Sequence, residues 1–327
     1  MRRSGRGTEH AAGPDATLRR GSQAARSAGE TSCDAAHALA LAEPDTALRP
    51  VLVVTDFDGT ISPLVLDPWG ARILPVARQA LRRLAGLPDV HVVILSGRMA
   101  ADVAARARVG GATYLGNHGI ERGWLPRGAP AERLVVTAVP SLEEYRDPAR
   151  ELADGVIRHV PEPWLVVERK PPAVTFHYRR APDMADAAAR IAAAVDQLDP
   201  GRTFVRFPGR RALELRPPGA AAKGDSLSTL LDEFRPAAVF ALGDDRSDAE
   251  AFGVLRAARA MGRVRGLALA VRARAEELPD VAAAADLVLA SPADAAGFLS
   301  GLARRLAARP GGTATARSGR VGRRVSP

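Results

Sequence analysis

The 327-residue sequence has a single cysteine, few aromatic residues and no long apolar run. Because Cys33 has no second cysteine to pair with, a disulfide within the chain is excluded, which fits a reducing compartment. Aromatic residues make up only 4% of the chain and hydrophobic residues 46%, so any core must be mainly aliphatic. No stretch approaches the ~18 apolar residues of a membrane span, and the N-terminus lacks the apolar region of a secretory signal. We therefore expect a cytoplasmic protein that does not enter a membrane.

The net charge of +9 is concentrated near the C-terminal end of the sequence. Residues 304–327 hold seven arginines and no acidic residue, whereas the six arginines of residues 1–48 are balanced by six acidic residues. Short segments rich in Arg, Gly and Ser are typical of solvated termini. We therefore expect a disordered N-terminal tail, residues 1–48, and a basic disordered C-terminal tail, residues 304–327. Nucleic acid is not expected to be a partner, because the body of the chain is nearly neutral.

A buried strand that ends in two carboxylates stands out in the first half of the chain. Residues 51–55 (Val-Leu-Val-Val-Thr) form a continuous apolar run, which is typical of a parallel strand covered on both faces. Asp56 and Asp58 follow two residues apart, so extended backbone would place both side chains on one face. Two buried like charges need a partner, and Mg²⁺ prefers hard oxygen ligands. A solvated Asp-rich turn is the alternative reading of these residues.

The next elements alternate between helices and strands. Apolar spacing predicts helices at residues 75–85 and 100–107. It predicts strands at residues 90–95 and 113–119. This alternation predicts a parallel sheet with right-handed crossovers, and such sheets bind ligands at the carboxyl ends of their strands. Ser96 follows one strand, and Asn117 and His118 end the other. We expect these side chains to share one cleft with the two aspartates.

From residue 135 to 216 the pattern changes to helices followed by hairpins. The predicted helices are at 141–160 and 184–198, and the predicted hairpins at 164–179 and 203–216. The alternation of strands and helices then resumes. We therefore expect an α/β fold: a Rossmann-like parallel-sheet core interrupted by an inserted α+β cap domain. The expected bounds are 49–134 and 217–303 for the core and 135–216 for the cap.

Lysine is rare in this chain, since only two of its 46 basic residues are lysines, Lys170 and Lys223. The ammonium group is a compact point charge, and the guanidinium group is a planar fork. A chain biased towards arginine is expected to keep lysine where the point charge matters. Both lysines stand at the ends of elements predicted to border the same cleft.

Four short motifs resemble those of the haloacid dehalogenase superfamily of phosphatases. They are Asp56-Phe57-Asp58-Gly59-Thr60, Ser96-Gly97-Arg98, Lys223-Gly224 and Gly243-Asp244-Asp245 with Asp248. Within this superfamily the chain is similar to the trehalose-6-phosphate phosphatase family, through Gly116-Asn117-His118-Gly119, Glu168-Arg169-Lys170, His177-Tyr178-Arg179 and Glu214-Leu215-Arg216-Pro217. The resemblance covers about residues 49–303 and departs from the family at Ala249, where a glutamate is usual.

The resemblance implies a Mg²⁺-dependent phosphatase that works through an aspartyl-phosphate. Asp56 would be the nucleophile and Asp58 the general acid and base, while Ser96 and Lys223 would bind the transferring phosphoryl group. The implied metal ligands are Asp56, Asp58 through its backbone carbonyl, Asp244, Asp245 and Asp248.

The resemblance also implies trehalose 6-phosphate as the substrate, in the last step of trehalose biosynthesis, and a functional pairing with a trehalose-phosphate synthase. Cap residues Glu168, Lys170 and Glu214 would bind sugar hydroxyls. The implied substrate contacts from the core are Arg98, Asn117 and His118. A structural role for His118 is an equally good reading.

Other functions stay open at this stage. A related phosphatase for sucrose phosphate or a glycosyl-phosphoglycerate would share the core chemistry, and a non-catalytic sugar-phosphate sensor would share the fold. Gly-Asp-Asp also occurs in polymerases, but there it lies in an antiparallel hairpin. A calcium-binding EF-hand loop is excluded, because Gly59 comes three residues after Asp56 instead of five.

Overall fold

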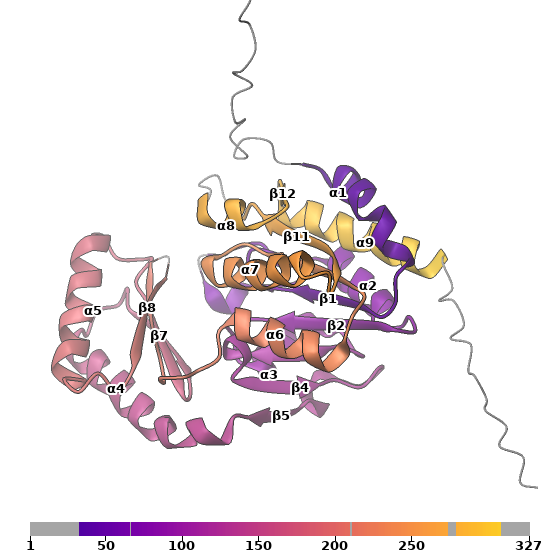
Figure 1. Cartoon of the computed structure of the whole chain (residues 1–327). Coiled ribbons are helices and arrows are strands. Elements are labelled where there is room, and N and C mark those ends of the chain that lie inside the picture. The colour runs from indigo at the N-terminus through magenta and orange to yellow at the C-terminus, as the bar shows by residue number, and fades with distance from the viewer. Residues whose placement is uncertain (1–32, 66, 210, 274–278, 309–327) are drawn as a thin grey trace, which may run out of the picture.

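The computed structural model describes residues 33–65, 67–209, 211–273 and 279–308, and these build two β-sheets that lie side by side (Figure 1). The larger sheet has the strand order β12-β11-β10-β1-β2-β3-β4-β5, and the smaller the order β6-β7-β9-β8. The strands are β1 (Val51–Thr55), β2 (Val90–Leu95), β3 (Thr113–Gly116), β4 (Glu121–Trp124), β5 (Val135–Ala138), β6 (Val166–Lys170), β7 (Ala173–His177), β8 (Val205–Gly209), β9 (Ala212–Arg216), β10 (Ala238–Gly243), β11 (Arg265–Val271) and β12 (Leu287–Leu289). The α-helices are α1 (Ala35–Ala42), α2 (Pro75–Leu84), α3 (Ala100–Ala107), α4 (Arg146–His159), α5 (Met184–Leu198), α6 (Lys223–Phe234), α7 (Arg246–Ala260), α8 (Pro279–Ala284) and α9 (Pro292–Ala308).

The larger sheet is the predicted α/β core, with β1 at its centre. β1 pairs in parallel with β10 on one side and β2 on the other. Val51 and Val53 pack into a cluster with α1, α2, α3 and α9, whereas Leu52 and Val54 pack on the opposite face with α6 and α7. Burial on both faces explains why the strand has a continuous apolar run. The α/β fold with a largely parallel sheet is confirmed.

Two strands at one edge of the larger sheet are antiparallel, and the sequence analysis did not anticipate them. β4 pairs with β3, and β5 pairs with β4. The expected start of the cap at residue 135 is therefore wrong, because residues 135–138 belong to the larger sheet. Val135 and Val136 favour a strand, but nothing in their sequence tells which sheet they join.

The smaller sheet and helices α4 and α5, which we call the cap, have their own apolar cluster. Phe176 and Leu215 of the sheet pack against Val156 of α4 and Ile191 of α5. Figure 1 shows both helices on the outer side, with the sheet turned towards the core. The chain passes between core and cap twice, once after β5 and once after β9.

Residues 33–48 are folded, which corrects the expected N-terminal tail. The Asp34 carboxylate caps α1 by accepting a hydrogen bond from the His37 N–H at 2.8 Å. Leu39 of α1 lies so close to α9 that a Cβ atom on Gly301 would come within 2.1 Å of it. The sequence analysis considered only the balanced charges of this segment and missed its short alanine-rich helix. The stability of this helix comes from packing rather than from helix propensity.

The C-terminal boundary also differs from the expected one: the core was expected to end at residue 303, but α9 continues to Ala308. Leu306 is buried and holds this last turn on the core. The rest of both expected tails, residues 1–32 and 309–327, lies outside the described residues. None of the described helices combines the length and the apolar character that crossing a bilayer requires.

Candidate active site

The carboxyl ends of the central strands and the cap sheet enclose a cavity of about 650 Å³. Thirteen residues were assigned from the sequence to catalysis, metal binding or the substrate, and nearly all of them meet here. Those that line the cavity are Asp56, Asp58, Ser96, Arg98, His118, Glu168, Lys170, Glu214, Asp244 and Asp245. Lys223 and Asp248 lie directly behind this lining. The Lys223 ammonium donates hydrogen bonds to Asp56 and to Asp248. The pattern follows from parallel topology, which brings strand ends far apart in sequence to one edge.

Asp56 and Lys223 form the buried centre of the site. Lys223 begins α6 and is only 1% exposed, and its Nζ donates to Asp56 Oδ1 at 2.8 Å. The same ammonium donates to Asp248 Oδ1 at 2.8 Å. Lys223 therefore supplies one positive charge to a group of largely buried carboxylates.

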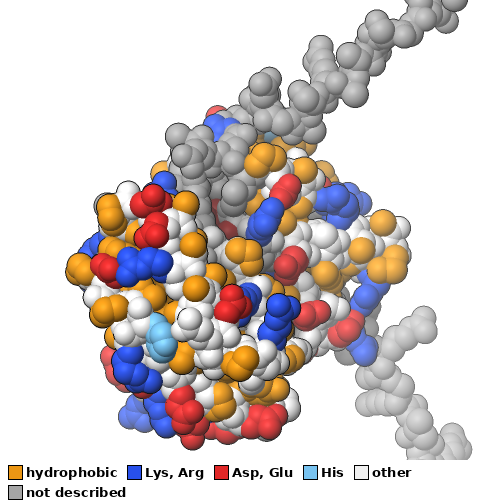
Figure 2. All heavy atoms as spheres, turned by 90° about the vertical axis from the view of Figure 1, so that its left-hand side faces the viewer, with side chains coloured by type: hydrophobic (Ala, Val, Ile, Leu, Met, Phe, Trp, Pro, Cys, Tyr) orange, Lys and Arg blue, Asp and Glu red, His pale blue; other side chains and the backbone are white. Residues whose placement is uncertain are grey.

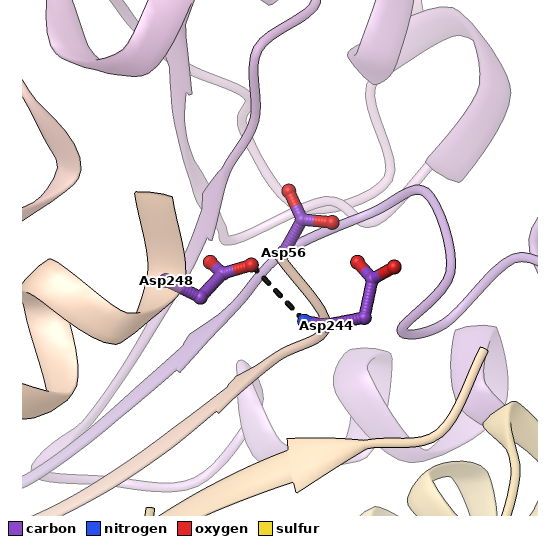
Figure 3. A group of neighbouring side chains, drawn as sticks. All are labelled: Asp56, Asp244 and Asp248. Atoms are coloured by element: carbon purple, nitrogen blue, oxygen red, sulfur yellow. Dashed lines mark hydrogen bonds between the residues drawn. The ribbon is translucent and has the colours of Figure 1, made fainter. Parts of the chain in front are cut away.

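Three carboxylates, those of Asp56, Asp244 and Asp248, come together beside this lysine (Figure 3). One oxygen from each lies within 4.8 Å of the others. Asp248 is fixed because its Oδ2 accepts the backbone N–H groups of Asp244 at 3.0 Å and Asp245 at 3.1 Å. Gly59 is required here: it has a φ of +81°, and a Cβ atom would come within 2.1 Å of Asp244 Oδ2.

The charges of this cluster do not balance without a cation. Burial, although opposed by Lys223, raises the pKa of Asp56 to about 6. Burial and the negative charge of Asp56 raise the pKa of Asp244 well above its ordinary value. A divalent cation would relieve this repulsion, and carboxylate oxygens are the ligands that Mg²⁺ prefers. The residues present therefore fit a Mg²⁺ site.

Two of the predicted metal ligands lie outside the carboxylate group. Asp245 caps α7: its Oδ1 accepts from the Asp248 N–H at 3.1 Å and from the Ser247 hydroxyl at 2.6 Å. The Asp58 side chain instead meets Arg98, whose Nε and Nη2 donate to its two oxygens at 2.6 and 2.9 Å. This two-point contact fixes the orientation of the Asp58 carboxylate.

Arg98 therefore has a different position from the one expected of a substrate ligand. It is buried and lies between Asp58 and Asp102, to which its Nη1 donates at 3.1 Å. Ser96 precedes it at the end of β2, is 1% exposed, and accepts the Arg98 backbone N–H at 3.2 Å. The Ser-Gly-Arg motif thus builds a rigid turn that lines the cavity and aims the guanidinium at Asp58.

The cap contributes a row of polar side chains across three strands. Glu168 on β6, Thr175 on β7 and Glu214 on β9 are cross-strand neighbours, so they share the face that lines the cavity. The Glu168 carboxylate contacts His177 Nε2 at 2.9 Å. Burial would raise the pKa of Glu168, but Lys170 and His177 outweigh it and lower that pKa to about 2.

Lys170 and Glu214 connect the cap to the core. Lys170 Nζ donates to Glu214 Oε1 at 2.7 Å and to the backbone carbonyl of Gly97 at 2.9 Å. Glu214 Oε2 also contacts His118 Nε2 at 3.3 Å. Burial would raise the pKa of Glu214, but Lys170 and His118 hold it well below the usual range. The two predicted cap residues therefore close the cavity on one side.

Asn117 is the predicted substrate ligand that the structure does not bring to the cavity. It is 1% exposed, and its Nδ2 donates to Glu121 Oε1 at 3.1 Å and to the Lys170 carbonyl at 3.4 Å. Neighbouring His118 does line the cavity, with its pKa lowered by burial. Both have positive φ, 48° and 60°. Asn117 supports the turn that presents His118.

The sequence analysis did not assign a role to Thr175, His177 or Arg179, all of which line the cavity. Thr175 is 5% exposed, and its hydroxyl has no hydrogen-bond partner among the described residues. The sequence did show that Thr175 and His177 alternate on a strand next to the one that carries Glu168. Only the register between these two strands shows that they share the cavity face with Glu168.

Figure 2 shows the molecule from the cap side, where acidic, basic and hydrophobic side chains are interspersed. No broad surface of one charge sign covers this face.

Comparison with known proteins identifies the family. A model of the trehalose-phosphatase family matches residues 54–291. A trehalose-phosphate phosphatase of Mycobacterium bovis is 35% identical over 283 residues, which cover 85% of this chain and 67% of the relative. A protein of the same description from Mycobacterium avium is 37% identical over 281 residues, covering 84% and 67%.

Solved structures agree with the sequence comparison. A structure of the trehalose-6-phosphate phosphatase of Aspergillus fumigatus matches with a TM-score of 0.55 and 25% identity, over 84% of this chain and 99% of that one. The fold, the strand-end carboxylates and these similarities agree with one another. The chain belongs to the trehalose-phosphatase family and is a phosphatase with the haloacid dehalogenase fold.

Proposed function

We propose that the protein hydrolyses trehalose 6-phosphate to trehalose and inorganic phosphate, the last step of trehalose biosynthesis, through an aspartyl-phosphate on Asp56. The observation that carries this proposal is a cavity with two chemically different ends. At its core end Asp56 lies 2.8 Å from the buried Lys223 ammonium, which suits a phosphoryl group. At its cap end Glu168, Thr175 and Glu214 form a row of oxygen atoms, which suits sugar hydroxyls.

The first chemical step is an attack by an Asp56 carboxylate oxygen on phosphorus. A phosphorus–oxygen bond to Asp56 forms while the bond to the sugar oxygen breaks, and Asp58 gives its proton to that leaving oxygen. Lys223 and Ser96 bind the phosphoryl oxygens during the transfer. A water molecule then attacks the phosphoryl group, Asp58 accepts the proton of that water, and Asp56 is released.

Arg98 is proposed to act on Asp58 rather than on the sugar. Its two-point contact holds the Asp58 carboxylate at the end of β1, in the same cavity as Asp56. We therefore assign Arg98 as a positioning residue and no longer as a primary substrate ligand.

Mg²⁺ is the proposed cofactor, and Asp56, Asp244 and Asp248 would hold it, together with the backbone carbonyl of Asp58. When bound, the ion would neutralise negative charge on the nucleophile and on the phosphoryl group. Among the residues that the structure describes, Lys223 supplies the positive charge bonded to the carboxylates of this cluster. Asp245 supports the site by capping α7.

Sugar recognition is assigned to the cap. Glu168, Lys170 and Glu214 are the proposed ligands, with Thr175 added from the structure and His118 from the core. A cytoplasmic location and a pairing with a trehalose-phosphate synthase, which would supply the substrate, are part of the same proposal. Asn117 is left out of the proposed ligand set, because it does not line the cavity and its amide is bonded to Glu121 behind it.

The test is phosphate release by the purified full chain with Mg²⁺. Trehalose 6-phosphate is compared with glucose 6-phosphate, sucrose 6-phosphate and glucosyl-phosphoglycerate, with an EDTA control and the Asp56→Asn variant. The proposal predicts EDTA-sensitive turnover that prefers trehalose 6-phosphate by at least about tenfold in kcat/KM and is lost in the variant. Preference for another ester would overturn the assignment of the cap residues. Binding of trehalose 6-phosphate without turnover would instead support a sensor.

A further inference from the structure

A second hollow, of about 580 Å³, lies at the opposite edge of the larger sheet from the active site. Four arginines line it, Arg82, Arg83, Arg127 and Arg304, and we call it the arginine hollow. The first two end α2, just before β2 begins, Arg127 follows β4, and Arg304 is in the last turns of α9. Figure 1 shows the end of α9 on the far side of the core from the cap.

The arginine hollow contains no acidic residue in its lining. The hydrogen-bond partners of its guanidinium groups are neutral: the backbone carbonyls of Arg108 and Gly86 and the hydroxyl of Ser300. Within the described part of the chain, none of the four forms a salt bridge, and Arg83 has no side-chain hydrogen bond. Many other arginines of this protein do pair with a carboxylate, as Arg122 does with Glu233 at 2.7 Å.

The positive charge at this edge is concentrated enough to affect its neighbours. Burial and the charges of Arg82 and Arg108 lower the pKa of the nearby Arg78 guanidinium. The carboxyl ends of α2 and α9 favour cations, but their partial charges do not neutralise four guanidinium groups. This edge is therefore a site of uncompensated positive charge.

We propose that the arginine hollow binds anions that contain several linked phosphate groups. Guanidinium groups match phosphate oxygens in a two-point geometry. The positive charge of four guanidinium groups around one hollow exceeds the charge that a single phosphate can neutralise. The lining contains no aromatic side chain, so it offers no platform on which nucleic-acid bases could stack. The ligand class is a phosphate chain, either inorganic polyphosphate or the triphosphate of a nucleotide. This site is separate from the catalytic cavity and does not depend on the proposed function.

The test is isothermal titration calorimetry of the full chain with inorganic tripolyphosphate, in EDTA so that chelation of Mg²⁺ does not contribute heat. The test variant is Arg83→Gln/Arg304→Gln, which removes two charges from the hollow. The matched control is Arg150→Gln/Arg263→Gln, which removes two exposed arginines elsewhere and changes the net charge equally. Thermal unfolding of each variant checks the fold, and the single Arg83→Gln variant replaces the double one if the double one is destabilised.

The proposal predicts saturable binding by the wild-type protein that weakens about tenfold or more in the test variant and less than twofold in the control. An equal loss in both variants would show that only the total charge matters, and unchanged binding in the test variant would place the anion elsewhere. Either result overturns the proposal, as does the absence of saturable binding. A full-length variant with the five arginines of residues 309–327 changed to Gln must keep binding, or the tail is the site instead.

Two further titrations identify the source of the phosphate chain. ATP and tripolyphosphate should bind with similar affinity, because the lining contains no aromatic side chain on which the base could stack. ATP binding more than about tenfold tighter, and still sensitive to the test variant, would assign the site to a nucleoside triphosphate. A single-stranded oligodeoxynucleotide that binds more tightly than polyphosphate of similar charge would overturn the phosphate-chain assignment in favour of nucleic acid.

Discussion

Replacing Asp56 by Asn should stabilise the metal-free protein, and the gain should grow as the pH rises. Asp56 is only 6% exposed, and burial raises its pKa from 3.8 to about 6. A carboxyl whose folded pKa is raised contributes stability that is present below the unfolded pKa and is lost as the pH rises through the folded value. The window therefore runs from about pH 4 to pH 6. Asn carries no charge, so the variant avoids this loss.

The magnitude follows from the size of the pKa change. One pKa unit corresponds to about 1.4 kcal/mol, so the variant should gain about 3 kcal/mol relative to wild type between pH 4 and pH 7.5. Asp244 acts in the same direction, because removing the charge of Asp56 also relieves the repulsion that raises its pKa. The variant would lose phosphatase activity while gaining stability, which is typical of a site selected for function.

Urea unfolding of both proteins in EDTA at several pH values from 4 to 7.5 measures the difference in the free energy of unfolding. The exposed Asp147→Asn substitution is the control, because it removes one carboxylate far from the cluster. A difference between Asp56→Asn and wild type that is flat across this range would refute the electrostatic account of the cluster. So would a variant that is less stable than wild type at every pH.

Three further predictions concern the same cavity. Adding Mg²⁺ should raise the Tm of the wild-type protein more than that of Asp244→Asn, and equal shifts in differential scanning fluorimetry would place the ion elsewhere. Thr175→Val should lower kcat/KM for trehalose 6-phosphate about two- to tenfold while Thr175→Ser keeps it, because one neutral hydrogen bond to the sugar is removed; equal kinetics in the two variants would exclude that bond. Gly59→Ala should destabilise the protein by about 1–3 kcal/mol and abolish activity, since its Cβ would collide with Asp244. An active variant whose crystal structure shows Asp244 in an unchanged position would contradict this.

The sequence predicted the core of the fold because its strands carry an unambiguous pattern. Residues 51–55 are buried on both faces, and only a parallel strand in the middle of a sheet has that pattern. The strand-end residues Asp56 and Ser96 could be placed for the same reason. Edge strands such as β5 have no such constraint, since all four of its residues are exposed. Its membership in the larger sheet depends on pairing with β4, which no local pattern specifies.

The contacts that sequence reasoning did not foresee are those with partners far along the chain. Arg98 was predicted to contact substrate and lines the cavity, and its guanidinium is bonded to Asp58, forty residues away. Asn117 was expected at the cavity, but Glu121 and the Lys170 backbone hold its amide. Propensity and spacing describe the near neighbours of a residue along the chain. They do not describe which of several carboxylates a buried polar group will meet.

The most direct test of the account is to trap the phosphorylated enzyme. The protein is mixed with Mg²⁺ and trehalose 6-phosphate, quenched within one turnover and treated with borohydride, which reduces an acyl phosphate to an alcohol. Mass spectrometry of the peptides that carry residues 51–60 and 238–248 then locates the reduced side chain. The account predicts reduction at Asp56 alone, and only when substrate is present. Reduction at Asp58 or Asp244, or turnover without any trapped residue, would contradict the assignment of Asp56 as the nucleophile.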